Sequence, residues 1–424
     1  MTAHARALGS CAALCVGSLA ACARPAPRRA DAPPASQPAA LSAPGPLAAR
    51  VLDLSRFRTP GAPPAPLGDA TDDDRALARA LAALGDGGGT IDVPPGEYEL
   101  HRSVALRGSP RAPLRLRGSG PASVLRFRVP DAAIVVHDTS DVTVEHLAVT
   151  GAASRMIVVD AAARVRVVGC DVSGGTALAA LHEAAGIWAS GVRDLRIEDN
   201  RLTGNGNAEG HFGADILFSG SMHDHPTSLG VLVRGNACTS VTAAAGIYLA
   251  NTVGAEVLGN LVTGARTAGE ALGYGILVSR ATPDATSSDN VVVGNVVAHT
   301  EGSGVYARAS TRARVAGNVV FDVATRQSER WLVVAAIALD GGEGHTVTGN
   351  FVSGSGHAGI GFTSTGTTVV GNRVEGALGA GIALRAACTG SVVRDNVVTR
   401  SARGVATFAG ASPADVEVRD NLDE

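Results

Sequence analysis

Residues 345–372 read HTVTGNFVSGSGHAGIGFTSTGTTVVGN and contain the unit from which most of the chain is built. Two short runs of alternating apolar and polar residues end in Gly-Asn, at Asn350 and Asn372. A third run, Gly-Ile-Gly-Phe at 359–362, lies between them. Short period-2 runs rich in β-branched residues predict strands, and none of these strands can bury a face alone. The unit must therefore stack on copies of itself.

Copies of this unit recur along the chain, each marked by an asparagine after a short apolar run. The marked positions are Asn200, Asn236, Asn260, Asn295, Asn318, Asn350, Asn372, Asn396 and Asn421, with His146 and Cys170 in the same slot of earlier copies. Successive positions are 22 to 25 residues apart, interrupted by four longer separations of 30 to 36. Such a period is typical of solenoids. We expect the asparagines to occupy left-handed corners and to hydrogen-bond up the stack.

The repeat resembles the right-handed parallel β-helix of the pectate-lyase-like superfamily, and so does the N-terminal entry to it. Residues 70–100 combine an acidic start, a short amphipathic helix predicted over 73–84, glycines at 87–89 that would end it, and a strand ending in Pro-Pro-Gly-x-Tyr. The resemblance implies an all-β solenoid, a single-stranded right-handed parallel β-helix of eleven or twelve coils with an N-terminal capping helix. It implies no particular reaction, because the superfamily contains lyases, hydrolases, epimerases and non-enzymatic members.

The first 22 residues have the pattern of an export signal. A short basic start precedes the apolar stretch 7–19, which is too short to span a bilayer. The sequence Leu19-Ala20-Ala21-Cys22 resembles the bacterial lipoprotein box, which implies lipidation of Cys22. The alternative is an ordinary secretory peptide cleaved near Ala23.

Residues 23–66 contain eleven prolines and predict an extended tether. The expected organisation is a signal at 1–22, the tether at 23–66 and one β-helix domain at 67–424. We expect an exported monomer, lipid-anchored in the bacterial cell envelope at the outer membrane or periplasmic face. The anchor would be its only contact with a membrane.

Composition excludes several functions. The formal net charge is −3 and all 36 basic residues are arginines, so nucleic acid is not an expected partner and no lysine-based mechanism is available. Beyond Cys22, the remaining mature cysteines are Cys170, Cys238 and Cys388, which are scattered and odd in number. We expect them to be buried single thiols, not a disulfide framework.

Aromatic residues gather in one predicted row. If the Ile of each Gly-Ile run points inward, the next residue points outward. That outward row reads Trp188, Leu217, Tyr248, Leu277, Tyr306, Ala338, Gly361, Ala383 and Ala406. With strands about 4.8 Å apart, Trp188, Tyr248 and Tyr306 would form a platform for stacking sugar rings. The alternative is a set of scattered surface aromatics.

Asp215 is the one large side chain in a row of glycine and alanine immediately before the inward residue. Longer segments at 204–213 and 219–230 flank it. They carry His211, His223, Asp224 and His225, and His182 lies nearby. We expect Asp215 on the outward face between Trp188 and Tyr248, where a partly walled carboxylate can act as acid, base or ligand. The alternative is a loop-capping carboxylate with solvated histidines.

Three chemistries fit these residues. Lyase or epimerase action on a uronate polymer needs a charge neutraliser, a base and a proton donor. Arg280 and Arg308 suit the first role, and Asp215, His211, His225 and Tyr248 supply candidates for the others. Glycoside hydrolysis needs paired carboxylates, for which Asp215 with Asp224, Glu270 or Asp340 are the candidates. Asp340 lies four coils from Asp215, too far for direct pairing in a straight stack.

The third chemistry is a metal site built from Asp215, His211, His223 and His225. The sequence requires no cofactor, and binding of a divalent metal ion remains an alternative. The run His223-Asp224-His225-Pro226 has the composition of the mannuronan C5-epimerase signature in a different order. No catalytic role is therefore carried over from that branch.

The sequence thus favours an envelope-anchored β-helix protein that binds and processes a polysaccharide. An acidic, uronate-containing polymer and lyase or epimerase chemistry fit best. Substrate contacts are assigned to Trp188, Tyr248, Tyr306, His223 and Asp224. The alternatives are a glycoside hydrolase on the same face and a non-catalytic scaffold that binds carbohydrate or assists metal-site assembly.

The lipid anchor is directly testable. In its host, the wild-type chain should incorporate radiolabelled palmitate and be released from membranes by detergent, because acylation buries the lipid chain in the bilayer. Cys22→Ser should abolish the label and leave the chain soluble or unprocessed. Absence of label from the wild-type chain would contradict the lipoprotein assignment.

Overall fold

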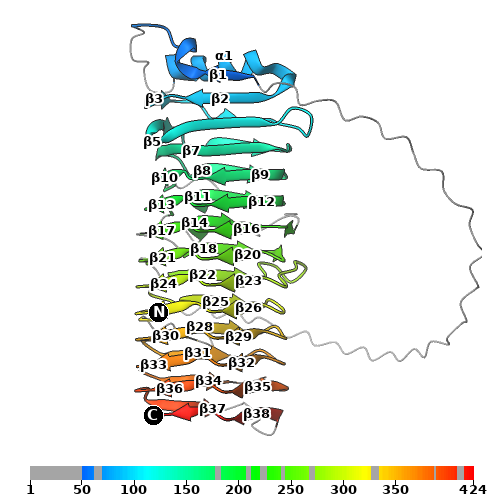
Figure 1. The fold of residues 1–424 in the computed structure, drawn as a ribbon, viewed down its shortest axis with the longest axis vertical. Coiled ribbons are helices and arrows are strands. Elements are labelled where there is room, and N and C mark those ends of the chain that lie inside the picture. The colour runs from blue at the N-terminus through cyan, green and yellow to red at the C-terminus, as the bar shows by residue number, and fades with distance from the viewer. Residues whose placement is uncertain are drawn as a thin grey trace, which may run out of the picture. The chain divides into compact units, whose positions relative to one another are not determined.

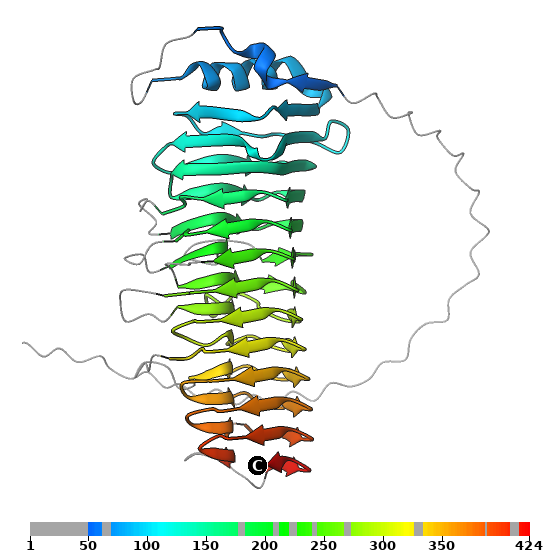
Figure 2. The same ribbon diagram turned by 60° about the vertical axis from the view of Figure 1, so that its left-hand side comes forward.

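A computed structural model describes residues 50–61, 69–176, 183–206, 212–219, 227–239, 244–266, 273–325, 334–385, 388–407 and 415–424. Residues 48–424 form one compact unit. Its strands pair in parallel and stack coil upon coil from β1 to β39, as Figures 1 and 2 show. The predicted parallel β-solenoid is confirmed.

One face of each coil belongs to a 12-stranded parallel sheet. Its strands, in stacking order, are β4 (Val104–Ala105), β6 (Ala132–His137), β8 (Arg155–Asp160), β11 (Glu183–Ser190), β14 (Phe212–Phe218), β18 (Ala245–Ala250), β22 (Tyr274–Ser279), β25 (Val305–Arg308), β28 (Ala335–Asp340), β31 (Ala358–Phe362), β34 (Ala380–Leu384) and β37 (Arg403–Thr407). The twelve strands agree with the eleven or twelve coils expected from the repeat.

The other strands form a 27-stranded sheet that runs along the stack in two lines. One line contains β1 (Val51–Asp53), β2 (Gly89–Val93), β5 (Leu114–Arg128), β7 (Val142–Ala152), β9 (Ala163–Val168), β12 (Arg193–Glu198), β15 (Ser228–Leu229), β16 (Leu232–Arg234), β19 (Thr252–Val253), β20 (Glu256–Leu258), β23 (Val291–Val293), β26 (Arg314–Ala316), β29 (Thr346–Thr348), β32 (Thr368–Val370), β35 (Ser391–Arg394) and β38 (Val416–Arg419).

The second line contains β3 (Gly96–Leu100), β10 (Asp171–Ser173), β13 (Arg201–Thr203), β17 (Ala237–Thr239), β21 (Leu261–Thr263), β24 (Val296–Ala298), β27 (Val319–Phe321), β30 (Phe351–Ser353), β33 (Arg373–Glu375), β36 (Val397–Thr399) and β39 (Leu422–Asp423). The long strands β5 and β7 join both lines, because β2 and β3 both pair with β5. Past β7, each coil contributes a separate strand to each line.

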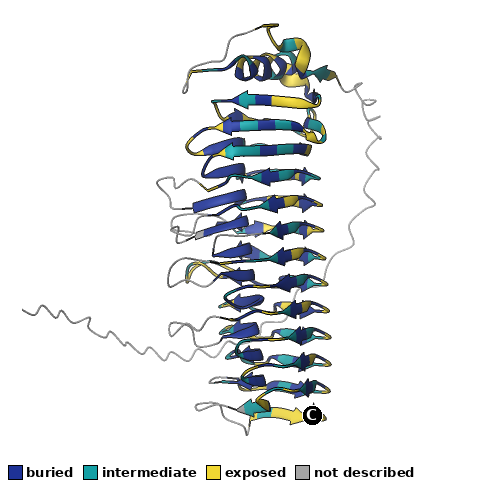
Figure 3. Ribbon diagram, turned by 90° about the vertical axis from the view of Figure 1, so that its left-hand side faces the viewer, coloured by how far each residue is buried: buried dark blue, intermediate teal, exposed yellow. Residues whose placement is uncertain are grey.

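The core is a continuous column of aliphatic side chains. The inward row predicted from the Gly-Ile runs is in register from coil to coil, for example Ile216 with Ile247 and Ile247 with Ile276. These three side chains are fully buried. Figure 3 shows buried residues through the whole stack, whereas the last strands at the C-terminal end are exposed. Stacking therefore supplies the burial that no single coil can achieve.

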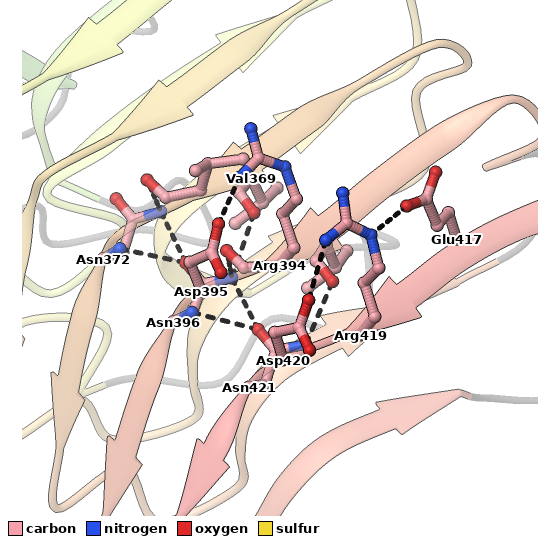
Figure 4. A network of polar contacts seen from close by, with 11 residues as sticks. Val369, Asn372, Arg394, Asp395, Asn396, Glu417, Arg419, Asp420 and Asn421 are labelled. Atoms are coloured by element: carbon pink, nitrogen blue, oxygen red, sulfur yellow. Dashed lines mark hydrogen bonds and ion pairs between the residues drawn. The ribbon is translucent and has the colours of Figure 1, made fainter.

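The repeated asparagines form a hydrogen-bonded ladder from Asn200 to Asn421. Asn318 donates from its backbone N and from Nδ2 to Oδ1 of Asn350, both at 2.9 Å, and Nδ2 also donates to the Val292 carbonyl. Its own Oδ1 accepts two hydrogen bonds from Asn295. Figure 4 shows the final steps of the ladder, through Asn396 to Asn421. The predicted stacking of identical side chains is confirmed.

The left-handed corner lies one residue earlier than expected. Gly317, Gly349 and Asp395, each directly before a ladder asparagine, have φ of 60°, 60° and 57°. The asparagines themselves lack positive φ. The preceding residue turns the chain, and the asparagine side chain then points into the buried corner, where Asn318 is fully buried.

The N-terminal end of the stack carries the predicted capping helix, α1 (Asp72–Leu84), between the 3₁₀ segments η1 (Leu54–Phe57) and η2 (Gly85–Gly87). Thr71 and Asp74 form a capping box. The side chains of Asp73 and Asp74 also accept hydrogen bonds from the backbone of β3 and the residues after it, which attaches the helix to the first coil. The helix ends at Gly85, with φ of 55°, and not at the later glycines.

The packed domain also begins earlier than the expected boundary at residue 67. Strand β1 lies within the proline-rich stretch assigned to the tether, yet its residues Val51 to Asp53 pair in parallel with Thr90 to Asp92. The prediction overlooked a three-residue strand because the surrounding prolines dominated the composition. No helix in the described ranges is long and apolar enough to cross a membrane.

The ladder makes a stability prediction. The Asn318 side chain donates two hydrogen bonds from Nδ2 and accepts two at Oδ1 in a buried corner. Asn318→Ala removes all four and leaves their buried partners unpaired. We expect a loss of roughly 3 kcal/mol in the free energy of unfolding, measured by urea denaturation. Asn421→Ala, at the less buried end of the ladder, is the matched control and should be much milder. Equal effects would mean that the ladder does not hold the coils together.

Candidate functional site

The 12-stranded sheet has two buried sides. Ile187, Ile216 and their equivalents pack in the solenoid core, whereas the next residue of each strand belongs to a separate apolar cluster on the outward side. The predicted outward row is in register, with Trp188 beside Leu217 and Leu217 beside Tyr248. The alignment is therefore confirmed.

The prediction that these aromatic residues form an exposed platform is wrong. Trp188, Tyr248 and Tyr306 are only 4%, 8% and 2% exposed. Alternation along a strand places these side chains on the outer side of the sheet, but it does not say whether that side meets solvent. In the folded chain their faces are packed within the second cluster, so ring stacking with a sugar is not available to them in this arrangement.

Asp215 does not lie on the outward face. It is fully buried, and its Oδ1 accepts a hydrogen bond of 2.7 Å from Nδ2 of Asn205, while its Oδ2 has no partner among the described residues. The sheet register passes from Ala185 beside Ala214 directly to Ile187 beside Ile216. The strand bends at this point, so Asp215 and Ile216 both face inward where strict alternation predicts opposite sides.

The rest of that row shows why its members are small. A Cβ added at Gly246, Gly275 or Gly359 would lie 2.2 to 2.3 Å from a valine Cγ1 of the second strand line. At the coil of Asp215 the equivalent residue of that line is Cys238, which is in register with Val262. Cysteine is smaller than valine, so the space next to it can hold the aspartate side chain where the other coils have glycine or alanine. Asp215 is therefore accommodated by interior packing, not by an open cleft.

Burial dominates the electrostatics of this interior group. It raises the pKa of Asp215 from 3.8 to about 7, against the opposing effect of the Asn205 hydrogen bonds. Burial, and then the charge of Asp215, raises the pKa of the Cys238 thiol well above its ordinary value. Cys170, Cys238 and Cys388 are free and buried, as expected. A protonated thiol in an apolar interior is chemically inert.

A polar cluster lies on the outward side of β22, β25 and β28, joined by the residue that follows β31. Tyr306 donates a hydrogen bond of 2.8 Å to Oδ2 of Asp340, and Thr363 donates one of 3.1 Å to Oδ1 of the same carboxylate. The Tyr274 ring packs against Tyr306, with ring centroids 5.0 Å apart. Arg308, the last residue of β25, is in register with Asp340 and exposed. We call these five residues the Asp340 cluster.

Two other predicted residues adjoin this cluster. Ser279, in register with Arg308, donates a hydrogen bond of 3.1 Å to the Tyr248 hydroxyl. The backbone N of Arg280 donates to the backbone carbonyl of Arg308 at 3.2 Å, and the Arg280 side chain is exposed. The structure thus brings Tyr248, Arg280, Tyr306 and Arg308 together on one face.

The three tyrosines of this face keep their protons at neutral pH. Burial raises the pKa of Tyr248, Tyr274 and Tyr306. For Tyr306 the Asp340 carboxylate raises the pKa further, because a phenolate beside it would be repelled. The positive charge of Arg308 opposes the rise at all three hydroxyls. Each hydroxyl is therefore a hydrogen-bond donor and not a ready base.

Trp188 lies in a different cluster on the same face. Its Nε1 donates a hydrogen bond of 2.6 Å to Glu183, whose other carboxylate oxygen accepts one of 2.8 Å from Ser219. The guanidinium of Arg155 lies 5.1 Å from the Trp188 ring centroid and pairs with Asp131. These contacts join four adjacent coils, those of β6, β8, β11 and β14.

Several predicted residues cannot be placed. Cys22, His182, His211, His223, Asp224, His225 and Glu270 lie outside the described residues. Within the described ranges no group of three or more His, Cys, Asp and Glu is arranged to hold a metal ion. Asp215, one of the proposed metal ligands, is buried in the solenoid core. The proposed histidine ligands lie outside the described residues, so that part of the metal hypothesis stays a prediction.

Tyr274 was missed by the sequence analysis, although a signal was present. It occupies a row two residues before the inward one, in which most positions are alanine. Members of this row are Ala132, Ala185, Ala214, Ala245, Ala335, Ala358 and Ala380, with Arg155, Tyr274 and Arg403 as large exceptions. The first two of these exceptions belong to the polar clusters described above.

The fold and register define a parallel β-helix solenoid. The family described as "Right handed beta helix region" matches residues 126–326 and 332–422, and the chain belongs to this family. No protein with a curated description matches the chain.

Solved structures share the architecture at low identity. A mannuronan C-5 epimerase A-module from Azotobacter vinelandii is 15% identical, with a TM-score of 0.62, over 87% of this chain and 99% of its own. A second A-module from the same organism is 16% identical, with a TM-score of 0.55, over 88% and 99%. DFA-IIIase from Arthrobacter chlorophenolicus is 16% identical, with a TM-score of 0.53, over 88% and 98%. At such identities the likeness concerns the fold.

The buried carboxylate of Asp215 makes a pH prediction. Its pKa rises from 3.8 to about 7 on folding, so the native state holds this proton more tightly. The stabilisation from Asp215 is complete below pH 3.8 and is lost as the pH rises through about 7. Asp215→Asn, which keeps the shape without the charge, should therefore melt higher than the wild type at pH 8 and at nearly the same temperature near pH 4. A variant that melts lower at pH 8 would contradict this account.

Proposed function

We propose that this protein binds an acidic polysaccharide at the Asp340 cluster and processes it by lyase or epimerase chemistry. The observation that carries the proposal is the exposed guanidinium of Arg308, in register with Asp340 and beside three buried tyrosines. Proton abstraction next to a uronate carboxylate requires that the carboxylate be neutralised and that protons be delivered by positioned donors. Arg308 and the tyrosine hydroxyls supply those two functions on one face.

Each residue takes a role that follows from its contacts. Arg308, assisted by Arg280, pairs with the uronate carboxylate. Tyr306 donates its only hydroxyl proton to Asp340 at 2.8 Å, so it positions that carboxylate and does not act as the base. His211 and His225, which the sequence offers as a base, lie outside the described residues. Asp215 takes no part, since its carboxylate is enclosed in the core.

Glycoside hydrolysis is less well supported. Asp340 and Glu183 lie on β28 and β11 of the same sheet, with β14, β18, β22 and β25 between them. Five strand spacings amount to about 24 Å. Paired carboxylates of glycosidases lie no more than about 9.5 Å apart, so these two cannot act on one bond.

The similar structures add support from outside the chain. Two of them are titled mannuronan C-5 epimerase modules, and they extend over most of this chain. We further propose that export and lipidation at Cys22 hold the domain in the cell envelope, where extracellular polysaccharide would reach it. The proline-rich segment after Cys22 fits a spacer between anchor and domain.

Activity on a panel of uronate polymers tests the proposal. The full-length chain should generate ultraviolet absorbance from new double bonds if it is a lyase, or change the uronate composition seen by proton NMR if it is an epimerase. Arg308→Gln should lower turnover at least roughly tenfold, because a charge-assisted contact is lost. The matched control is Arg314→Gln, an exposed arginine on β26 of the other sheet.

The outcomes separate the alternatives. New reducing ends without new double bonds would favour a hydrolase over a lyase or epimerase. Binding of a uronate polymer without any reaction would favour a non-catalytic carbohydrate-binding scaffold. Equal losses in the Arg308 and Arg314 variants would remove the Asp340 cluster from the mechanism.

A further inference from the structure

Tyr274 has a buried hydroxyl that the folded chain does not use. The side chain is 7% exposed, and its hydroxyl oxygen has no hydrogen-bond partner among the described residues. A buried hydroxyl without a partner destabilises a folded protein, because its hydrogen bonds to water are lost and not replaced. Such groups are rare in native structures, and each calls for a specific explanation.

The neighbouring tyrosines differ from Tyr274 in this respect. The Tyr306 hydroxyl is engaged with Asp340, and the Tyr248 hydroxyl accepts a hydrogen bond from Ser279. Tyr274 lies against Tyr306 with the ring planes inclined by 33°. The unused hydroxyl therefore sits beside an already satisfied pair, and packing against Tyr306 limits how far its ring can turn away.

Charge indicates what this hydroxyl would meet. Burial raises the pKa of Tyr274, so the group is a donor throughout the neutral range and calls for an acceptor. Arg308 and Asp340 are its charged neighbours, and Arg308 is the exposed one. An acceptor that enters past Arg308 is favoured if it is anionic, because it pairs with the guanidinium as it accepts from the hydroxyl.

We propose that Tyr274 donates a hydrogen bond to a carboxylate oxygen of a uronate residue whose charge is paired with Arg308, and so determines specificity for acidic over neutral sugars. This inference rests on the proposed function and adds a residue that the sequence did not suggest. A site built to hydrogen-bond a substrate group discriminates strongly, because an analogue lacking that group leaves the donor unpaired. Sulfate esters share the anionic oxygen chemistry and form a separate arm of the test.

The test compares wild type with Tyr274→Phe in the full-length chain by titration calorimetry. The probes are a uronate oligosaccharide, a neutral oligosaccharide of matched length, and a sulfated derivative of the neutral one. For the uronate probe we expect a loss of affinity of about tenfold or more, as one charge-assisted hydrogen bond is removed. The preference for uronate over the neutral probe should shrink by the same factor.

Thermal unfolding of the same variant separates binding from a structural role. Removing an unpaired hydroxyl while keeping the ring should leave the melting temperature unchanged or raise it. Tyr98→Phe is the matched control, since Tyr98 is a buried tyrosine on β3 of the other sheet. It should not alter discrimination between the probes.

Each outcome decides between two claims. If wild type binds uronate and Tyr274→Phe binds it equally well, the Tyr274 inference is wrong and the proposed function stands. Tighter binding of the sulfated probe than of the uronate, lost in Tyr274→Phe, would overturn the carboxylate assignment. If wild type binds none of the probes, the proposed function itself fails. A sharp fall in melting temperature with unchanged affinity would make Tyr274 a packing residue.

Discussion

The structure depends on the pairing of every coil with the next, and the asparagine ladder maintains that pairing where it is hardest to keep. Between two strand lines the chain must turn sharply, and its backbone groups there cannot all reach a partner in regular sheet geometry. Each ladder asparagine from Asn236 to Asn396 spans this corner with a backbone donor, a side-chain donor and an acceptor that takes two hydrogen bonds. Because these side chains bond to copies of themselves, the corner keeps the same shape along the ladder.

The repeated corner also explains why some positions in the solenoid are restricted to small residues. Because the corners repeat, the strands of successive coils are in register and the two sheets pack closely. Some rows of positions between the sheets have no space for a side chain. The glycines that precede the inward isoleucines face valines of the second strand line at such distances. Asp215 departs from this row only where Cys238 replaces the valine, so the exception is matched by a change in its neighbour. A buried carboxylate with an unused oxygen is the result.

The outward side of the 12-stranded sheet follows different rules. It is no part of the core, yet it holds a second apolar cluster and two groups of polar side chains around Glu183 and Asp340. Each cluster keeps one polar atom without a partner among the described residues, Nε of Arg155 beside Glu183 and the Tyr274 hydroxyl beside Asp340. The arginines differ, because Arg155 is buried and Arg308 is exposed. The exposed arginine makes the Asp340 cluster the better candidate for ligand binding.

The sequence by itself determined the solenoid, the alignment of its coils, the capping helix and the buried thiols. These features are repeated or local, so each appears as a period, a row or a cap in one dimension. Only the tertiary structure decided which side Asp215 faces, because the bend that turns it inward leaves no mark in an alternating pattern. It also decided that Trp188, Tyr248 and Tyr306 are covered, since burial depends on neighbours from other coils. Tyr274 stood out in its row as the tyrosine among alanines, but only the packing around its hydroxyl gave that exception a meaning.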